Sequence, residues 1–201
     1  MLREHRDMVL LIRCDVFRHP LKDSSLDIAI CDHALQHIRD HARAYSKMSR
    51  VFVPNGLFSI CVYSRENNWP MTHVVEPAKS VLHLFPLKTL RWAAFVPALL
   101  IWLYSVVVCR FIGLLFPRLA VRMPWIELFT LWIKDGFKKI WEVSFGLIHA
   151  PISYHFPRSE VVSLAESNSQ QSLTLEMINS ILWTMVARKP WTVKAIFTTN
   201  V

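Results

Sequence analysis

The chain has 201 residues, a net charge of +8 and a hydrophobic content of 53%, which is above the average for soluble proteins. This length suits one domain, or one domain that carries a large insertion. The four cysteines, Cys14, Cys31, Cys61 and Cys109, show no C-x-x-C or other metal spacing, and nothing in the sequence demands disulfides, which fits a reducing cytoplasmic setting. The N-terminal apolar run is too short for a signal peptide.

The first part of the sequence predicts a β-α-β unit. Residues 8–14 read as a buried strand that leads to Asp15, and residues 27–32 read as a second strand. Residues 39–50 predict a crossover helix. Residues 57–63 predict a strand that is apolar on both faces, as in parallel sheets covered by helices on both sides. Ligands of such sheets bind beyond the carboxyl ends of the strands, so we expect the functional residues there.

Polar residues follow the strand predicted at 27–32. Asp32, His33 and His37 lie within six residues, which invites a metal interpretation, but their spacing matches no known zinc motif. We therefore predict no metal. A histidine at this place could act as a general base, or it could hydrogen-bond the backbone and shape the turn, and the residues alone leave both readings open.

Between about residues 69 and 150 the composition becomes apolar and basic. Residues 92–109 carry no charge, and as a helix they would span about 27 Å, near the lower limit for crossing a bilayer. Residues 77–141 hold nine Lys or Arg and two acidic residues, a balance of 9 − 2 = +7, and five of the eight tryptophans. Membrane interfaces favour this composition. Three alternatives stay open: a helical cap on the membrane, a soluble lid, or a transmembrane hairpin. Because the basic residues lie among apolar helices, nucleic-acid binding is not expected.

The C-terminal part predicts a loop, a helix and two strands. Residues 149–157 form an aromatic loop bounded by prolines, and Pro157 suits the first turn of a helix that runs to about Glu166. Residues 172–177 and 181–188 predict an antiparallel strand pair. The tail, residues 191–201, has no assignment.

Several short motifs along this order resemble the class I S-adenosylmethionine-dependent methyltransferases of the type 11 family. Each motif is weak alone, but their combined spacing over about residues 9–64 is specific. The matching pieces are Asp15, residues 19–21 (HPL), residues 25–27 (SLD), Asp32, residues 34–37 (ALQH) and residues 50–56 (RVFVPNG).

The resemblance implies S-adenosylmethionine as the cofactor and a small-molecule or lipid-like methyl acceptor as the partner. His37 matches a histidine that often faces the substrate in this family. The residues that the resemblance assigns to the site are, for the cofactor, Asp15, Val16, Asp32, His33 and Ala34; for catalysis, His37; and for the substrate pocket, Tyr63, Tyr154 and His155.

Two parts of the family pattern are missing from the sequence. The four glycines leave no G-x-G loop for the methionine part of the cofactor, and no acidic residue corresponds to the one that holds its ribose. We therefore expect a chain truncated at its N-terminus by a strand, a loop, a helix and another strand. Asn55 replaces a glycine of the family, which is a mild change because Asn tolerates positive φ.

The predicted fold class is α/β, a partial Rossmann-like methyltransferase sheet with a large apolar helical insertion and a C-terminal antiparallel strand pair. Residues 1–68 are expected to form the C-terminal half of the core, residues 69–150 the lid, and residues 151–201 the closing helix, last strands and tail. The predicted function is S-adenosylmethionine-dependent methyl transfer. The alternative is an inactive methyltransferase fragment that acts as a membrane-associated interaction protein. The expected location is the cytoplasm, peripheral to the membrane through residues 69–150, and the oligomeric state is left open.

Overall fold

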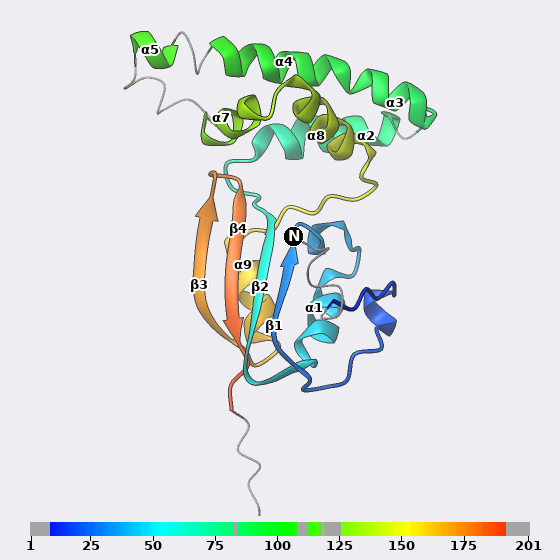
Figure 1. Ribbon diagram of the computed structural model, residues 1–201, viewed down its shortest axis with the longest axis vertical. Coiled ribbons are helices and arrows are strands. Elements are labelled where there is room, and N and C mark those ends of the chain that lie inside the picture. The colour runs from blue at the N-terminus through cyan, green and yellow to red at the C-terminus, as the bar shows by residue number, and fades with distance from the viewer. Residues whose placement is uncertain (1–8, 83, 108–111, 117, 119–125, 192–201) are drawn as a thin grey trace, which may run out of the picture.

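A four-stranded sheet occupies one end of the molecule and a group of helices the other (Figure 1). This computed structural model describes residues 9–82, 84–107, 112–116, 118 and 126–191. The strands, in the spatial order β1-β2-β4-β3, are β1 (Leu26–Asp32), β2 (Phe52–Tyr63), β4 (Leu182–Arg188) and β3 (Gln171–Ile178). Strands β1 and β2 are parallel, whereas β4 is antiparallel to both β2 and β3. The predicted mixed α/β fold with a C-terminal antiparallel strand pair is confirmed.

The predicted β-α-β unit is also present. Short 3-10 turns, η2 (Val16–Arg18) and η3 (Leu35–His37), precede and follow β1, and helix α1 (His41–Ser49) connects to β2. The Asp40 carboxylate caps this helix by accepting from the Arg43 N–H at 3.2 Å. Asn55 adopts the left-handed φ of 68° that the sequence suggested for it, early in β2.

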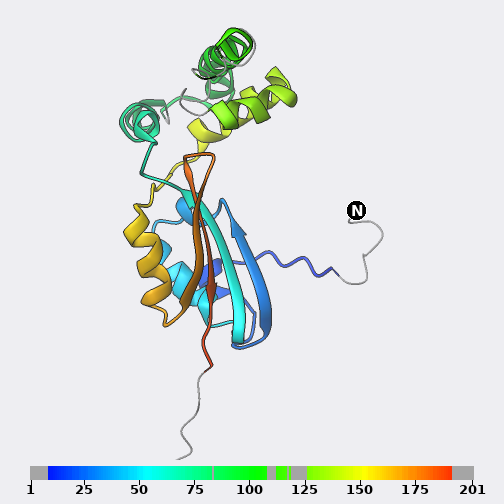
Figure 2. The ribbon, with the colours of Figure 1, turned by 90° about the vertical axis from the view of Figure 1, so that its left-hand side faces the viewer.

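Helices α1 and α9 (Arg158–Glu166) both lie on one face of the sheet (Figure 2). Side chains of a strand alternate between faces, and the buried set of β2 points to this side. Phe58, Ile60 and Val62 of β2 are buried together with Tyr45 of α1 and Val161 of α9. This cluster is the main hydrophobic core, and it holds the strand ends in place for the site.

Two predictions were wrong, one about the opposite face of the sheet and one about the N-terminal segment. We expected helices on both faces, but no described helix packs on this side, and Ile30 of β1 is 74% exposed. We also expected a buried strand over residues 8–14, but the described residues of that segment form no strand, and Leu11 is 90% exposed. Apolar runs become buried strands only where another element covers them, and the described residues supply no such cover here.

The helices that lie between β2 and α9 in the sequence form a cap beyond one end of the sheet (Figure 1). Its elements are η4 (Met71–Val75), α2 (Glu76–Leu82), α3 (Leu87–Ala93), α4 (Phe95–Val106), α5 (Gly113–Leu115), α7 (Ile126–Lys134) and α8 (Phe137–His149). Helix α4 packs against α7 and α8, and α3 packs against α8. Leu90, Ala94 and Ile148 form a small buried cluster of the cap. The Trp141 indole also donates to the Arg91 carbonyl at 2.8 Å, so the cap has a core of its own.

One helical stretch of the cap, Leu87–Val106, is long and apolar enough to cross a membrane by length and composition. Only 22% of its apolar window is buried within the molecule. A core helix of a soluble protein can pass the same test of length and composition, so this finding alone is weak evidence for a span. The stretch comprises α3 and α4, which meet at Ala94, three residues before Pro97.

Candidate functional site

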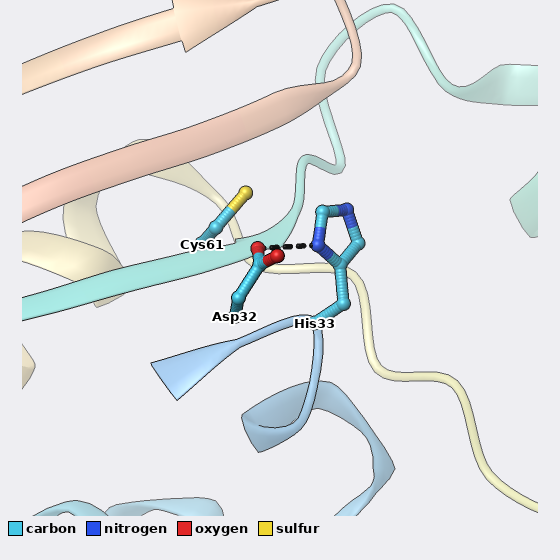
Figure 3. A group of neighbouring side chains, drawn as sticks. All are labelled: Asp32, His33 and Cys61. Atoms are coloured by element: carbon cyan, nitrogen blue, oxygen red, sulfur yellow. Dashed lines mark hydrogen bonds and ion pairs between the residues drawn. The ribbon is translucent and has the colours of Figure 1, made fainter. Parts of the chain in front are cut away.

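Two strand ends bring three polar side chains together at the carboxyl edge of the sheet (Figure 3). Asp32 ends β1 and lies in register with Cys61 of β2 because the two strands are parallel. His33 follows with a left-handed φ of 51°, and its backbone N–H donates to the Cys61 carbonyl at 3.0 Å. Its Nδ1 lies 2.6 Å from Oδ1 of Asp32. The turn therefore folds the imidazole back onto the two strand ends.

The surroundings of His33 favour its protonated form. A hydrogen bond with the Cys61 side chain is the largest influence and raises the pKa, desolvation lowers it, and the Asp32 carboxylate raises it further. The net effect raises the pKa of His33 from 6.5 to about 9, so the imidazole is cationic at neutral pH and pairs with Asp32. Both side chains remain substantially open to solvent, so this pair contributes little to folding stability and stays accessible to a ligand.

The same three residues have the donor set of a metal site. Their ligand atoms lie within 4.8 Å of one another, close enough for oxygen, nitrogen and sulfur to meet at one divalent cation. We predicted no metal from the spacing of residues within one stretch of the sequence. That spacing could not include Cys61, because Cys61 comes from another strand. A proton bound to His33 would compete with a metal for the same imidazole. The absence of a metal stays a prediction.

Tyr63, the last residue of β2, lies at the centre of a group of histidines. Its ring centroid is 5.9 Å from that of His33, 5.9 Å from that of His37 and 5.6 Å from that of His155. Burial raises the pKa of Tyr63, so its hydroxyl is neutral at physiological pH. The Nδ1 atom of His37 lies 2.7 Å from the carbonyl oxygen of Ile152, which holds this ring against the loop before α9.

A cavity of about 380 Å³ lies between the carboxyl edge of the sheet and the cap. This volume is within the range of small-molecule sites. Its wall is polar where His33, Tyr63 and His155 lie and at Glu76 and Lys79 of α2, whereas most of the other residues that the cap contributes are apolar. The apolar lining residues from the cap are Met71, Val75, Ile101, Leu128, Trp132, Val143 and Leu147.

A buried cation on α2 also lines the cavity. Lys79 is 3% exposed, and its Nζ donates to Oε1 of Glu76 and to Oγ of Ser153, at 2.7 Å in each case. Lysine is rarely buried without such partners, because removing an ammonium group from water is costly. The contacts join α2 of the cap to the loop before α9, and both partners also line the cavity.

Two more lining residues have properties that suit a ligand site. Desolvation lowers the pKa of His155, which keeps this imidazole neutral at physiological pH. Asn68 is 2% exposed and donates through Nδ2 to the Ser64 carbonyl, but its Oδ1 has no hydrogen-bond partner among the described residues. A buried acceptor without a partner calls for an explanation, and a ligand in the cavity would provide one.

The structure brings together part of the residue set that the sequence assigned to the site. His33, Tyr63 and His155 line the cavity, Asp32 contacts His33, and His37 contacts Tyr63 without lining the cavity itself.

The other assigned residues lie away from the cavity wall. Asp15 caps η2 by accepting from the Phe17 N–H at 2.9 Å, and Val16 packs against the sheet core. Ala34 is exposed directly after His33. The ring centroid of Tyr154 lies 4.5 Å from that of His41, and the Tyr154 hydroxyl donates to a carboxylate of α9. Their roles remain predictions.

Sequence reasoning missed Cys61, Asn68, Glu76, Lys79 and Ser153. Cys61 could have been found, because it lies two residues before Tyr63 on the same face of the predicted strand. The i,i+3 spacing of Glu76 and Lys79 was visible too, but such pairs are common on exposed helix surfaces. Only the position of the cap shows that this pair is buried beside a cavity.

Residues 2–60 match the model of a family described as a methyltransferase domain. The resemblance to class I S-adenosylmethionine-dependent methyltransferases is thus confirmed for this segment, which includes β1, α1 and most of β2. No curated protein matches the sequence.

Solved structures of several methyltransferases resemble the chain at low identity. One is the 1,6-didemethyltoxoflavin-N1-methyltransferase of Burkholderia thailandensis with bound S-adenosylhomocysteine, at 12% identity and a TM-score of 0.44, covering 89% of this chain and 50% of that one. Another is a possible histamine N-methyltransferase of Thermotoga maritima, at 12% identity and a TM-score of 0.45, covering 94% and 69%. A third is human N-acetylserotonin methyltransferase, at 11% identity and a TM-score of 0.43, covering 93% and 37%. The chain spans half the length of the first of these proteins.

Proposed function

We propose that this chain takes part in methyl transfer from S-adenosylmethionine to a small, largely apolar acceptor held in the cavity. The position of the cavity supports this function. It lies between the carboxyl edge, where the resemblance places the cofactor residues, and the apolar cap. Because His33 belongs to both the edge and the cavity wall, an acceptor in the cavity would lie beside these residues.

The residues at the edge fit the methionine end of the cofactor. Asp32 and His33 are oppositely charged neighbours that are open to solvent, so they could pair with the ammonium and carboxylate groups of a bound amino acid. S-adenosylmethionine, when bound, supplies an electrophilic methyl group on a sulfonium. The sequence has no glycine-rich loop, so these 201 residues account for only part of its binding.

His155 is the best-placed group to receive a proton from the acceptor. It lines the cavity, and its lowered pKa keeps it neutral and able to accept a proton near pH 7. The apolar residues of the cap would exclude water and hold the acceptor in line for displacement. His37, the catalytic residue predicted from the sequence, would contact Tyr63 and the Ile152 carbonyl without reaching the acceptor.

A cavity-filling variant tests the proposal. The purified chain is incubated with millimolar S-adenosylmethionine labelled in its methyl group and with decanoate, 4-octylphenol or decylamine as probe. We expect label in at least one probe, and loss of that label in Val75→Trp, which fills the cavity. Val74→Trp is the matched control, because Val74 is exposed on the same helix. Absence of label from all three probes, or equal label in both variants, would refute this function.

We further propose that the outer face of the cap rests on an anionic membrane surface on the cytoplasmic side. One stripe of exposed apolar side chains runs along α3 and α4 at a spacing of three or four residues. It consists of Trp92, Val96, Leu100, Leu103 and Val107, of which Trp92 is 69% and Leu100 62% exposed. The neighbouring Lys88 and Arg91 are exposed and basic, which suits anionic headgroups.

Vesicle sedimentation tests the membrane proposal. Vesicles of phosphatidylserine and phosphatidylcholine should pull down the wild-type chain, and added salt should weaken the binding. The double variant Leu100→Glu, Leu103→Glu should stay in solution. Leu173→Glu introduces one such substitution at an exposed site on β3, outside the cap, and should still sediment. Full recovery of the wild-type chain in the supernatant would refute the membrane proposal and favour a cap that is a soluble lid.

A further inference from the structure

We propose that Lys79 and Ser153 form a subsite for the carboxylate of an otherwise apolar ligand, an inference that rests on the proposed acceptor cavity. It narrows the class of ligand from small and apolar to apolar with one anionic oxygen group. Unused hydrogen-bond donors of a buried ammonium group and a hydroxyl, together with the apolar lining opposite, support this subsite.

Two donors of this pair are available to a ligand. An ammonium group has three N–H donors, and Lys79 uses two of them in its contacts with Glu76 and Ser153. Ser153 accepts in its contact with Lys79, and among the described residues its own hydroxyl proton has no acceptor. Both residues line the cavity. The remaining N–H and the O–H can therefore serve the two oxygens of one carboxylate.

The two charged pairs beside the cavity each hold their own counter-charge. Lys79 is bonded to Glu76, and His33 lies beside Asp32, so neither pair leaves an excess charge on the wall. The ammonium group of Lys79 makes a charge-assisted hydrogen bond to a carboxylate, which is stronger than the bond that it makes to a neutral hydroxyl. The donors themselves therefore favour an anionic oxygen group.

The apolar side of the cavity selects the rest of the ligand. Ile101, Trp132 and Leu147 of the cap lie on this wall, and their side chains are apolar over most of their surface. A ligand with a hydrocarbon or aromatic body gains from burial there, while its carboxylate meets the donors at the polar wall. A small, fully polar anion would gain only the second contact.

Calorimetric titration with decanoate and decanol, two probes that share a hydrocarbon chain, tests the subsite without cofactor. The wild type should bind decanoate more tightly than decanol. Lys79→Met keeps the buried hydrocarbon stem and should weaken decanoate binding about tenfold or more, with little change for decanol. Lys88→Met is the matched control, because Lys88 is exposed on α3, and it should bind both probes as the wild type does.

Glu76→Gln separates recognition from a structural role. It removes the carboxylate that competes for Lys79, so decanoate should bind severalfold more tightly. If the pair only fastens α2 to the loop, Glu76→Gln and Lys79→Met should both weaken binding of both probes, and this result would overturn the proposal. Equal binding of decanoate and decanol by the wild type would also overturn it. Because no methyl transfer is measured, failure here is distinct from failure of the proposed function.

Discussion

At the scale of single residues, two histidines near Tyr63 have different surroundings. His155 stacks on Tyr63, lines the cavity and has a pKa lowered by desolvation. His37 meets the same ring edge-on, and its Nδ1 is engaged with the Ile152 carbonyl. A proton acceptor must reach the proton that it removes, so the cavity position favours His155 as the base.

We therefore expect His155→Gln to lower methyl transfer about 10²-fold or more, which is the usual scale for losing general-base help. His37→Ala should reduce the free energy of unfolding by about 1 kcal/mol, because it removes one hydrogen bond, and should leave the rate per folded molecule nearly unchanged. Thermal midpoint and turnover are measured on the same preparations. A folded His37→Ala chain with strongly reduced turnover would restore His37 as the catalytic residue.

At the scale of elements, Glu66 connects the end of β2 to β4 and α9. Its carboxylate accepts from the Arg158 N–H, the Trp183 indole and the Ser64 hydroxyl, at 2.9 Å in each case. Burial alone raises the pKa of Glu66, but these hydrogen bonds outweigh it and hold the pKa below its usual 4.5. The three contacts fix the sheet edge that leads into the cavity.

This carboxylate makes the folding stability depend on pH. Because the folded pKa lies below the unfolded value of 4.5, the stabilisation is complete above pH 4.5 and is lost as the pH falls through the folded pKa. Glu66→Ala should lower the free energy of unfolding by about 2 kcal/mol at pH 7, with a smaller loss at low pH. Glu176→Gln, at an exposed position on β3, is the control and should have little effect. Denaturant titrations at several pH values measure both, and an equal loss at pH 7 and at low pH would refute the linkage.

At the scale of the molecule, the cap lies beyond one end of the sheet (Figures 1 and 2), and the cavity lies between the two. The sheet presents an acid and a cationic histidine at its carboxyl edge, and the cap closes the space above with apolar side chains. Strand β1 lies at the edge of the described sheet, with Ile30 of that strand exposed. The residues that fit the cofactor therefore cover its methionine end only.

From this arrangement we expect the 201-residue chain to bind S-adenosylmethionine weakly, with a Kd of roughly millimolar order, by calorimetric titration. The glycine-rich loop and the ribose-holding acid of the family pattern have no counterpart in the sequence, so most contacts to the cofactor are missing. Asp32→Asn should weaken the residual binding further, because it removes the partner expected for the ammonium group. Micromolar affinity of the wild-type chain would contradict this expectation.

The sequence by itself determined the local elements. These elements depend on interactions between residues that are close in the sequence, so they can be predicted without the fold. The signals are the alternation of apolar residues, the polar run of α1, Pro157 before α9 and the tolerance of Asn55 for positive φ. Tertiary structure decided which apolar runs are covered, which is why Ile30 is exposed although helices were expected on both faces of the sheet. It also decided that Cys61 meets Asp32, because strand register joins residues far apart in the chain. Lys79 was one of nine basic residues in its region, and only the packing of α2 against the loop before α9 buries it beside the cavity.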